Sequence, residues 1–469
     1  MTQSRHLFVA LVTVAVVVGV ARIAARQSLM QRPSDTTMHN LAERYVKLVL
    51  AMEPHDPDYV DAYYGPDAWR EQADRDALAL PQIGTAAQVL LDELEQTSPG
   101  NGADVAGDVD DSDAEASLPH LRRQYLSRQL QALQTRVRML AGEVLTFDDE
   151  SNALYDAVAP SHPDSYFRET LAVLESRLPG AGPLVDRYER FRSGFVVPPA
   201  RLDRVFDAAI TECRRRTLDH VSLPEGEQFE VEYVTDKSWS GYNWYQGNFR
   251  SLIQVNTDLP IYIDRAIDLA CHEGYPGHHV YNVLLEQHLV RDRGWPEFSV
   301  YALFSPQSLI AEGTANYGIE VAFPPDERLA FERDVLFPAA GLDPARTVEY
   351  YDIQRLVSQL EYAGNEAARR YVNGQIDRAA AADWMSRYAM MAPARAEQRT
   401  RFFDQYRSYV INYNLGKDLV AGYVEARSDG DADARWKVFA ALLASPRLPS
   451  GLRDSRPAAT ARDDEKEKL

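Results

Sequence analysis

The sequence predicts a mainly α-helical protein with one small β-hairpin or sheet. Apolar residues recur at spacings of three and four along most of the 469 residues, which is typical of helices that pack on one face. Alternating apolar and polar residues, the pattern of half-buried strands, are confined to residues 229–259. The chain is 45% hydrophobic, which is enough for a large core. These observations together favour helices packed on helices.

The expected elements follow this pattern in chain order. A helix at 36–52 precedes a turn at 65–66, where glycine and proline together favour a chain reversal. In the alternating segment, 229–234 and 251–257 are each typical of a strand, and the aromatic stretch 239–249 between them is typical of turns. Further helices are expected at 121–144, 166–178 and 200–218, and from 312 to about 445.

The composition divides the chain into four expected parts with one internal loop. The stretch 98–117 has no aromatic residue and many aspartates, which favours a flexible acidic loop. The expected parts are residues 1–30 as a signal peptide or N-terminal membrane anchor, 31–220 as an N-terminal helical part, 221–454 as a catalytic part, and 455–469 as a disordered tail.

An apolar run near the N-terminus indicates export. Residues 7–21 follow Arg5 and hold no charge, and the run is short for a membrane span but suits the core of a signal peptide. Small residues at its end would serve a signal peptidase, whereas Arg22 and Arg26 favour an uncleaved anchor. We expect the protein in the periplasm, at the cell surface or anchored in the membrane, with its catalytic part outside the cytoplasm.

Charge and cysteine content exclude some classes of partner and framework. The net charge of −20 argues against nucleic acid or an anionic membrane surface as the main partner. The two cysteines, Cys213 and Cys271, are too few for a disulfide framework.

The stretch 268–290 carries the strongest functional signal. It places His272, Glu273, His278 and His279 close together between two apolar runs of helical spacing. Zinc peptidases use two imidazoles as metal ligands and, next to the first, a carboxylate that takes a proton from water. Their usual motif is H-E-x-x-H, because residues four apart lie on one helical face. We therefore predict a metal site on a broken helix.

The spacing of the histidines requires that break. His278 comes six residues after His272, about 240° around a regular helix, whereas His279 returns to the same face roughly 10 Å along the axis. Pro276 cannot donate a backbone hydrogen bond, and Gly277 can adopt the angles that bring the chain back. A two-residue bulge makes His278 the second ligand and leaves His279 to support a ligand or face the substrate. A sharper bend would exchange the two histidines.

Glu312 is a suitable third ligand. It opens the sequence EGTANYGIE, in which Glu312, Asn316 and Glu320 share one helical face that is too polar for a core. A glutamate from a second helix completes a His-His-Glu set and leaves the fourth position open for water. We expect one Zn²⁺ per chain on His272, His278 and Glu312.

These two blocks resemble the bacterial family of uncharacterised proteins called DUF885, which carries H-E-x-x-P-G-H-H followed by E-G-x-A-x-Y-x-E. The chain has HEGYPGHH at 272–279 and EGTANYGIE at 312–320, with Thr314 where that family commonly has tryptophan and with the last glutamate, Glu320, one position later than in that pattern. The family is similar to helical zinc peptidases whose third ligand is a glutamate. The resemblance is specific over about 260 to 325 and implies a metallopeptidase-like fold with zinc-dependent peptidase activity.

The resemblance also implies residues that contact the substrate. In zinc peptidases an edge strand beside the metal pairs with the substrate backbone, and Gln254, Asn256 and Thr257 fall where such a strand would lie. An ordinary structural hairpin is the alternative. Tyr413 begins YNLG, which resembles the Y-x-x-G block of the family and would supply a phenol to an oxyanion. Packing within a stripe of tyrosines on one helical face is the alternative for Tyr413.

The sequence thus predicts an exported zinc-dependent metallopeptidase in which Glu273 acts as the general base, with a donor to the oxyanion in Tyr413 or His279. Its partner would be a peptide or another amide substrate. The alternatives are a zinc-dependent amidase acting on a non-peptide or cell-wall substrate, and a metal-free binding protein on the same fold. Side-chain pockets decide between such substrates, and no motif identifies those pockets.

Overall fold

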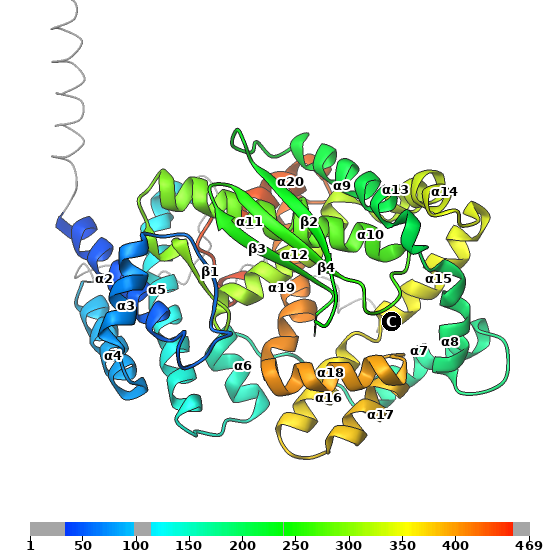
Figure 1. The fold of residues 1–469 in the computed structure, drawn as a ribbon, viewed down its shortest axis with the longest axis horizontal. Helices are drawn as coiled ribbons and strands as arrows, with labels where there is room; N and C mark the ends of the chain where they lie inside the picture. The colour runs from blue at the N-terminus through cyan, green and yellow to red at the C-terminus, as the bar shows by residue number, and fades with distance from the viewer. Residues whose placement is uncertain (1–32, 98–113, 238, 454–469) are drawn as a thin grey trace, which may run out of the picture.

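The computed structural model confirms a mainly α-helical fold with small sheets (Figure 1). It describes residues 33–97, 114–237 and 239–453. The expected signal peptide or anchor, most of the acidic loop and the C-terminal tail lie outside the described residues. The helices are α2 (Pro33–Ala51), α3 (Asp67–Asp76), α4 (Leu80–Gln96), α5 (Ala114–Leu140), α6 (Phe147–Tyr155), α7 (Asp164–Arg177), α8 (Leu184–Arg192), α9 (Leu202–Leu218), α10 (Asp264–Leu269), α11 (His278–Leu285), α12 (Pro306–Ala322), α13 (Pro325–Phe331), α14 (Phe337–Ala340), α15 (Thr347–Ser358), α16 (Tyr362–Val372), α17 (Arg378–Tyr388), α18 (Pro393–Tyr406), α19 (Ile411–Ser428), α20 (Ala432–Leu443) and α21 (Pro449–Arg453).

The expected helices at 36–52, 166–178 and 200–218 correspond to α2, α7 and α9. Helix α5 begins at Ala114, earlier than expected, so the last residues of the predicted acidic loop are helical. Alanine and glutamate at this start are good helix formers, and they extend the helix into the acidic stretch. No helix among the described residues is long and apolar enough to cross a membrane.

The expected small sheet is present directly before the histidine-rich stretch. It consists of β2 (Gln228–Val234), β3 (Gly241–Gly247) and β4 (Arg250–Asn256) in the order β2-β4-β3, with β2 parallel and β3 antiparallel to β4. Most of the stretch expected to form turns is strand β3, because its buried and exposed side chains alternate. The turn itself is limited to Asn248 and Phe249, whose φ angles are 53° and 61°, as a tight hairpin requires.

A second, two-stranded sheet joins distant parts of the chain. Strand β1 (Val60–Tyr63) pairs antiparallel with β5 (Val300–Ala302). This pairing brings the segment after α2 next to the segment that leads into α12. The sequence predicts only a turn near β1, and no local pattern indicates this sheet.

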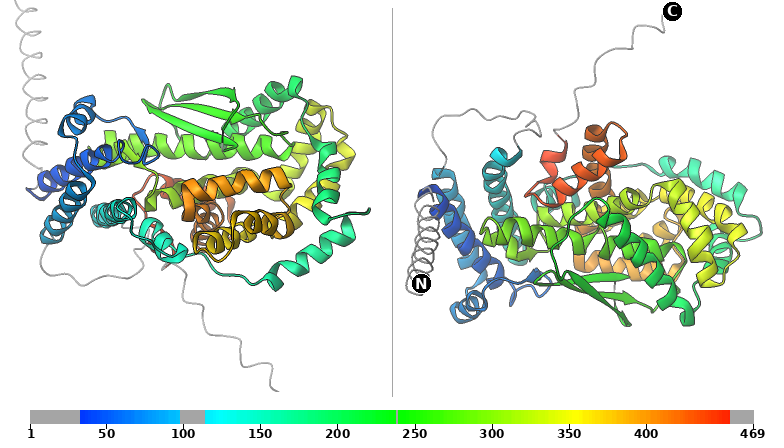
Figure 2. Two further views of the ribbon diagram at one scale, coloured as in Figure 1. Left: turned by 60° about the horizontal axis from the view of Figure 1, so that its bottom comes forward. Right: turned by 90° about the horizontal axis from the view of Figure 1, so that it is seen from above.

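The elements around the histidines lie in successive layers. The three-stranded sheet packs on the segment from α10 to α11, this segment packs on α12, and α12 packs along α19. Figure 2 (left) shows the sheet above this segment and the orange helices α18 and α19 below it. Helices α2 to α5 lie at one end of the molecule, and α8 lies with α13 to α15 at the other (Figure 1). Buried apolar side chains on both sides of the predicted boundary at 220/221 belong to one hydrophobic cluster.

Helices α12 and α19 approach closely at a pair of glycines. A Cβ atom on Gly313 would lie 2.5 Å from the backbone of Gly416, and one on Gly416 would lie 2.7 Å from the carbonyl oxygen of Leu309. Any larger residue would therefore push the helices apart. Gly313 follows Glu312, and Gly416 ends the YNLG sequence that Tyr413 begins. The contact holds the helix that carries Glu312 against the helix that carries Tyr413.

Candidate metal centre

The helix that carries the first histidine is interrupted where the sequence predicts a break. Helix α10 passes into a π-helical segment, Ala270–Gly274, which holds His272 and Glu273, and α11 begins anew at His278. A Cβ atom on Gly277 would lie 1.9 Å from the carbonyl oxygen of His272. Only glycine fits at this point of the turn, and the turn brings the two histidines together.

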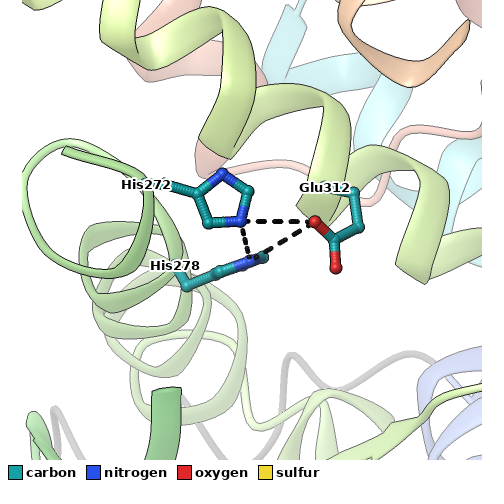
Figure 3. A group of neighbouring side chains, drawn as sticks. All are labelled: His272, His278 and Glu312. Carbon is teal, nitrogen blue, oxygen red and sulfur yellow. Dashed lines mark hydrogen bonds and ion pairs between the residues drawn. The ribbon is translucent and has the colours of Figure 1, made fainter. Parts of the chain in front are cut away.

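His272, His278 and Glu312 converge as the sequence predicts (Figure 3). The two histidine Nε2 atoms are 3.1 Å apart, and Glu312 Oε2 lies 3.3 Å from His272 Nε2 and 3.7 Å from His278 Nε2. Ligands about 2.0 Å from a tetrahedral zinc ion are expected to lie roughly 3.3 Å from one another. The three donor atoms therefore form a possible metal-binding triad whose spacing fits zinc.

The charges around the triad favour a cation. Burial opposes protonation of His278, but the Glu312 carboxylate, aided by Glu273 and Asp61, outweighs it and raises the pKa of His278 to about 9. Burial likewise opposes ionisation of Glu312, yet the two histidines hold its pKa well below the usual range. The side chains of His272, His278 and Glu312 are only 14%, 13% and 9% exposed, so water screens these interactions weakly.

The two oxygens of Glu312 have different surroundings. Oε1 accepts a hydrogen bond of 2.8 Å from the hydroxyl of Tyr409, which belongs to the short helix before α19. Oε2, which faces the histidines, is buried and has no hydrogen-bond partner. A buried carboxylate oxygen without a donor is costly, and a metal ion is the natural group to satisfy it. Tyr409 orients the ligand from behind, as partners of metal ligands usually do.

Glu273 lies beside the triad and outside it. Its side chain is only 4% exposed, and its backbone carbonyl accepts a hydrogen bond of 2.7 Å from Asn243 Nδ2 on β3. A Cβ atom on Gly241, at the start of the same strand, would lie 2.9 Å from Glu273 Oε1. Strand β3 therefore runs directly against the carboxylate that the sequence predicts to be the general base.

His279, the neighbour of the second histidine, faces away from the triad. Its side chain is fully buried, with Nδ1 2.9 Å from Ser251 Oγ and Nε2 3.0 Å from Glu227 Oε2. Glu227 also accepts hydrogen bonds from Tyr275 at 2.7 Å and Arg214 at 2.6 Å. The expectation that His279 faces the substrate or donates to an oxyanion is wrong, because both of its ring nitrogens are used inside the protein.

Tyr413 lies near the triad, at the start of α19. Its ring centroid is 5.9 Å from that of Tyr409. Burial raises the pKa of the Tyr413 phenol, and the carboxylates of Glu312 and Glu273 raise it further while Arg399 opposes them. The phenol is therefore neutral at ordinary pH and able to donate a hydrogen bond. Its role toward an oxyanion stays a prediction.

The strand that carries Gln254 and Asn256 is not the edge strand that was expected. Gln254 and Asn256 lie on β4, the central strand of the sheet, whose backbone is paired on both sides by β2 and β3. Strand β4 cannot pair with a substrate backbone, so that expectation is wrong. Hydrogen bonds within the protein hold the three predicted side chains: Gln254 to Glu232, Asn256 to the carbonyls of Lys237 and Trp239, and Thr257 to the carbonyl of Val234. Strand β3, next to Glu273, lies at the edge of this sheet.

Sequence reasoning missed two further groups near the triad. Asp61 on β1 accepts a hydrogen bond from the hydroxyl of Tyr242 on β3. Burial raises the pKa of Asp61 to about 6, although Tyr242 and His278 oppose the shift. No spacing rule connects β1 with the histidines, so the aromatic sequence around Asp61 was the only signal.

No protein-family model matches the chain, and no curated protein sequence matches it. Among solved structures, the chain is similar to a "putative lipoprotein" from Colwellia psychrerythraea, with a TM-score of 0.47 and 16% identity over 82% of this chain and 71% of that one. It is also similar to a "putative lipoprotein of unknown function" from Shewanella oneidensis, with a TM-score of 0.40 and 12% identity over 78% of this chain and 74% of that one. The resemblance to DUF885 stays a prediction.

Proposed function

We propose that this protein is a zinc-dependent metallopeptidase. The observation that carries the proposal is the triad of His272, His278 and Glu312, in which a buried oxygen of Glu312 makes no hydrogen bond among the described residues and faces two imidazole nitrogens at 3.3 and 3.7 Å. Two histidines and one glutamate are the ligands of a catalytic zinc site, which keeps its fourth position open. Glu273 lies next to the triad, as a general base must.

Three residues of the chain have separate roles in the proposed hydrolysis. Zinc, when bound, supplies a Lewis acid that lowers the pKa of water and polarises a carbonyl group. Glu273 accepts a proton from the attacking water at its carboxylate and delivers it to the amine as the C–N bond breaks. Tyr409 holds the Glu312 carboxylate in place through the bond to Oε1. Tyr413 offers a neutral phenol for the oxyanion that forms at the carbonyl.

We also propose that the protein acts outside the cytoplasm. The support is the apolar run 7–21 after Arg5, which suits a signal peptide or an anchor. A reporter enzyme fused after residue 30 is expected to be active only outside the cytoplasm. Reporter activity inside the cytoplasm would reject this proposal.

Elemental analysis and peptide cleavage test the main proposal. We expect purified protein to hold one zinc per chain and to cleave some members of a peptide panel, while a parallel panel of cell-wall fragments reports amidase activity. Glu273→Gln should keep its zinc and lose about 10² to 10⁴-fold in activity, as removal of a general base does. Protein that binds no zinc, or a Glu273→Gln variant as active as the original, would contradict the proposal. Cleavage of cell-wall fragments alone would show an amidase.

A further inference from the structure

Two arginines on one face of α18 have no carboxylate partner in the part of the chain that the structure describes. Arg395 and Arg399 are four residues apart and therefore lie one above the other on the helix. Among the described residues, neither guanidinium lies within ion-pair distance of a carboxylate, although the chain has 70 acidic and only 50 basic residues. Arginines in such an acidic chain would ordinarily find carboxylates.

Arg399 lies beside the candidate metal centre. Its guanidinium carbon is 4.2 Å from the ring centroid of Phe402 and 5.5 Å from that of Tyr413. Tyr413 in turn lies 5.9 Å, centroid to centroid, from Tyr409, which donates to Glu312, so contacts through two aromatic rings connect Arg399 with the metal ligand. The aromatic rings hold the flat guanidinium by cation–π contact and leave its N–H groups available.

Arg395 extends the same basic face to the edge strand. Its Nη2 donates a hydrogen bond of 2.9 Å to Ser240 Oγ, and Ser240 directly precedes Gly241, the residue that packs against Glu273. The two arginines therefore extend from Tyr413 to the start of β3, and both of these segments adjoin the triad.

Four arginines lie close together at this place, and among the described residues carboxylates pair with only two of them. Loss of contact with water lowers the pKa of Arg395 to about 10, and the positive charges of Arg265, Arg399 and Arg192 add to this shift. Arg265 and Arg192 have carboxylate partners at 3.3 and 3.0 Å, but Arg395 and Arg399 do not. Like charges held together favour the binding of an anion. Asp61 and Glu273, the acidic groups whose charges act on His278, would repel the same anion.

We propose that Arg395 and Arg399 form a subsite that binds a carboxylate of the peptide substrate next to the scissile bond. The proposal rests on the proposed peptidase function and names its substrate class, peptides with a carboxylate close to the bond that is cleaved. Guanidinium groups recognise carboxylates through paired, charge-assisted hydrogen bonds. The carboxylate would come from a free peptide C-terminus or from an aspartate or glutamate side chain.

Equilibrium binding to the Glu273→Gln protein, loaded with zinc, tests the subsite without turnover. One pair of peptides differs only in a free or amidated C-terminus, and a second pair differs only in glutamate or glutamine near that end. In at least one pair, the peptide with the carboxylate should bind about 10- to 100-fold more tightly, the effect of a hydrogen-bonded charge. The pair that shows the difference identifies the source of the carboxylate.

Arginine variants made in the same protein show where the preference arises. Arg395→Gln and Arg399→Gln should each reduce it, and the double variant should abolish it. Arg401→Gln is the matched control, because Arg401 is exposed on the same helix and points in another direction. Arg401→Gln should keep the preference.

Equal binding within both pairs, no detectable binding, or a preference that survives the double variant would overturn the subsite. Failure of the peptidase proposal gives a different result. A preference for carboxylates without cleavage by the unsubstituted protein would reject the peptidase and keep the subsite. Cleavage without any preference would reject the subsite and keep the peptidase.

Discussion

Two groups of similar composition lie on opposite sides of the start of α11. One joins His272 and His278 to Glu312 and Tyr409, and the other joins His279 to Glu227, Tyr275, Arg214 and Ser251. Each contains histidine, a buried glutamate and a tyrosine that donates to that glutamate. His278 belongs to the first group and the next residue, His279, to the second.

The two groups differ in whether their buried polar atoms have hydrogen-bond partners. Both oxygens of Glu227 accept hydrogen bonds and both ring nitrogens of His279 have partners. In the candidate metal centre, Glu312 Oε2 has no donor. Buried polar groups that are fully paired stabilise a fold, whereas a buried polar atom without a partner needs a further explanation, which the proposed metal ion would supply for Glu312. Hydrogen-bond pairing, rather than residue type, distinguishes these two groups.

The largest expected difference comes from replacing the two adjacent histidines. His278→Ala removes a metal ligand, so we expect its zinc affinity to fall by more than the roughly 100-fold that loss of a supporting group costs. His279→Ala should keep zinc and lower the free energy of unfolding by about 3 to 5 kcal/mol, because Glu227 loses a buried partner. Zinc titration and thermal unfolding of both variants measure these effects. Zinc loss in His279→Ala alone would reverse the assignment.

A smaller difference is expected from the two tyrosines. Tyr409→Phe removes the hydrogen bond to Glu312 and should weaken zinc binding by about 10- to 100-fold. Tyr275→Phe removes the corresponding bond to Glu227 and should cost about 1 to 3 kcal/mol of stability with zinc affinity unchanged. Competition with a zinc chelator gives the affinities, and urea unfolding gives the stabilities. Equal effects of the two variants on zinc would show that the groups are not separate.

The smallest expected effect is the pH dependence of the stability that Glu227 contributes. Burial opposes ionisation of Glu227, but His279, Tyr275 and Arg214 outweigh it and lower its pKa below the ordinary value of 4.5. The ionised carboxylate therefore adds stability that is full above about pH 4.5 and disappears as pH falls through the lower folded-state pKa.

We accordingly expect Glu227→Gln to be less stable than the original protein by about 1 to 3 kcal/mol at pH 7. The two proteins should converge in stability as the pH falls below about 4.5. Unfolding in denaturant at several pH values measures the difference. A difference that grows in acid would contradict the sign of the pKa shift.

The local part of the candidate site follows from the sequence. Six residues separate His272 from His278, and over such a distance helix geometry, Pro276 and Gly277 decide which side chains can meet. The same periodicity predicts the mainly helical fold and the small sheet, since both patterns are local. Glu312 could be predicted from its polar helical face, although only the tertiary structure shows that it reaches the histidines.

Contacts between distant segments were decided by the tertiary structure alone. Periodicity identifies which face of an element is buried, but it does not identify the element that packs there. The central position of β4, the burial of His279 against Glu227, and the support of Glu312 by Tyr409 all depend on such packing. The lack of carboxylate partners for Arg395 and Arg399 among the described residues also depends on packing, because the fold decides which side chains surround each arginine.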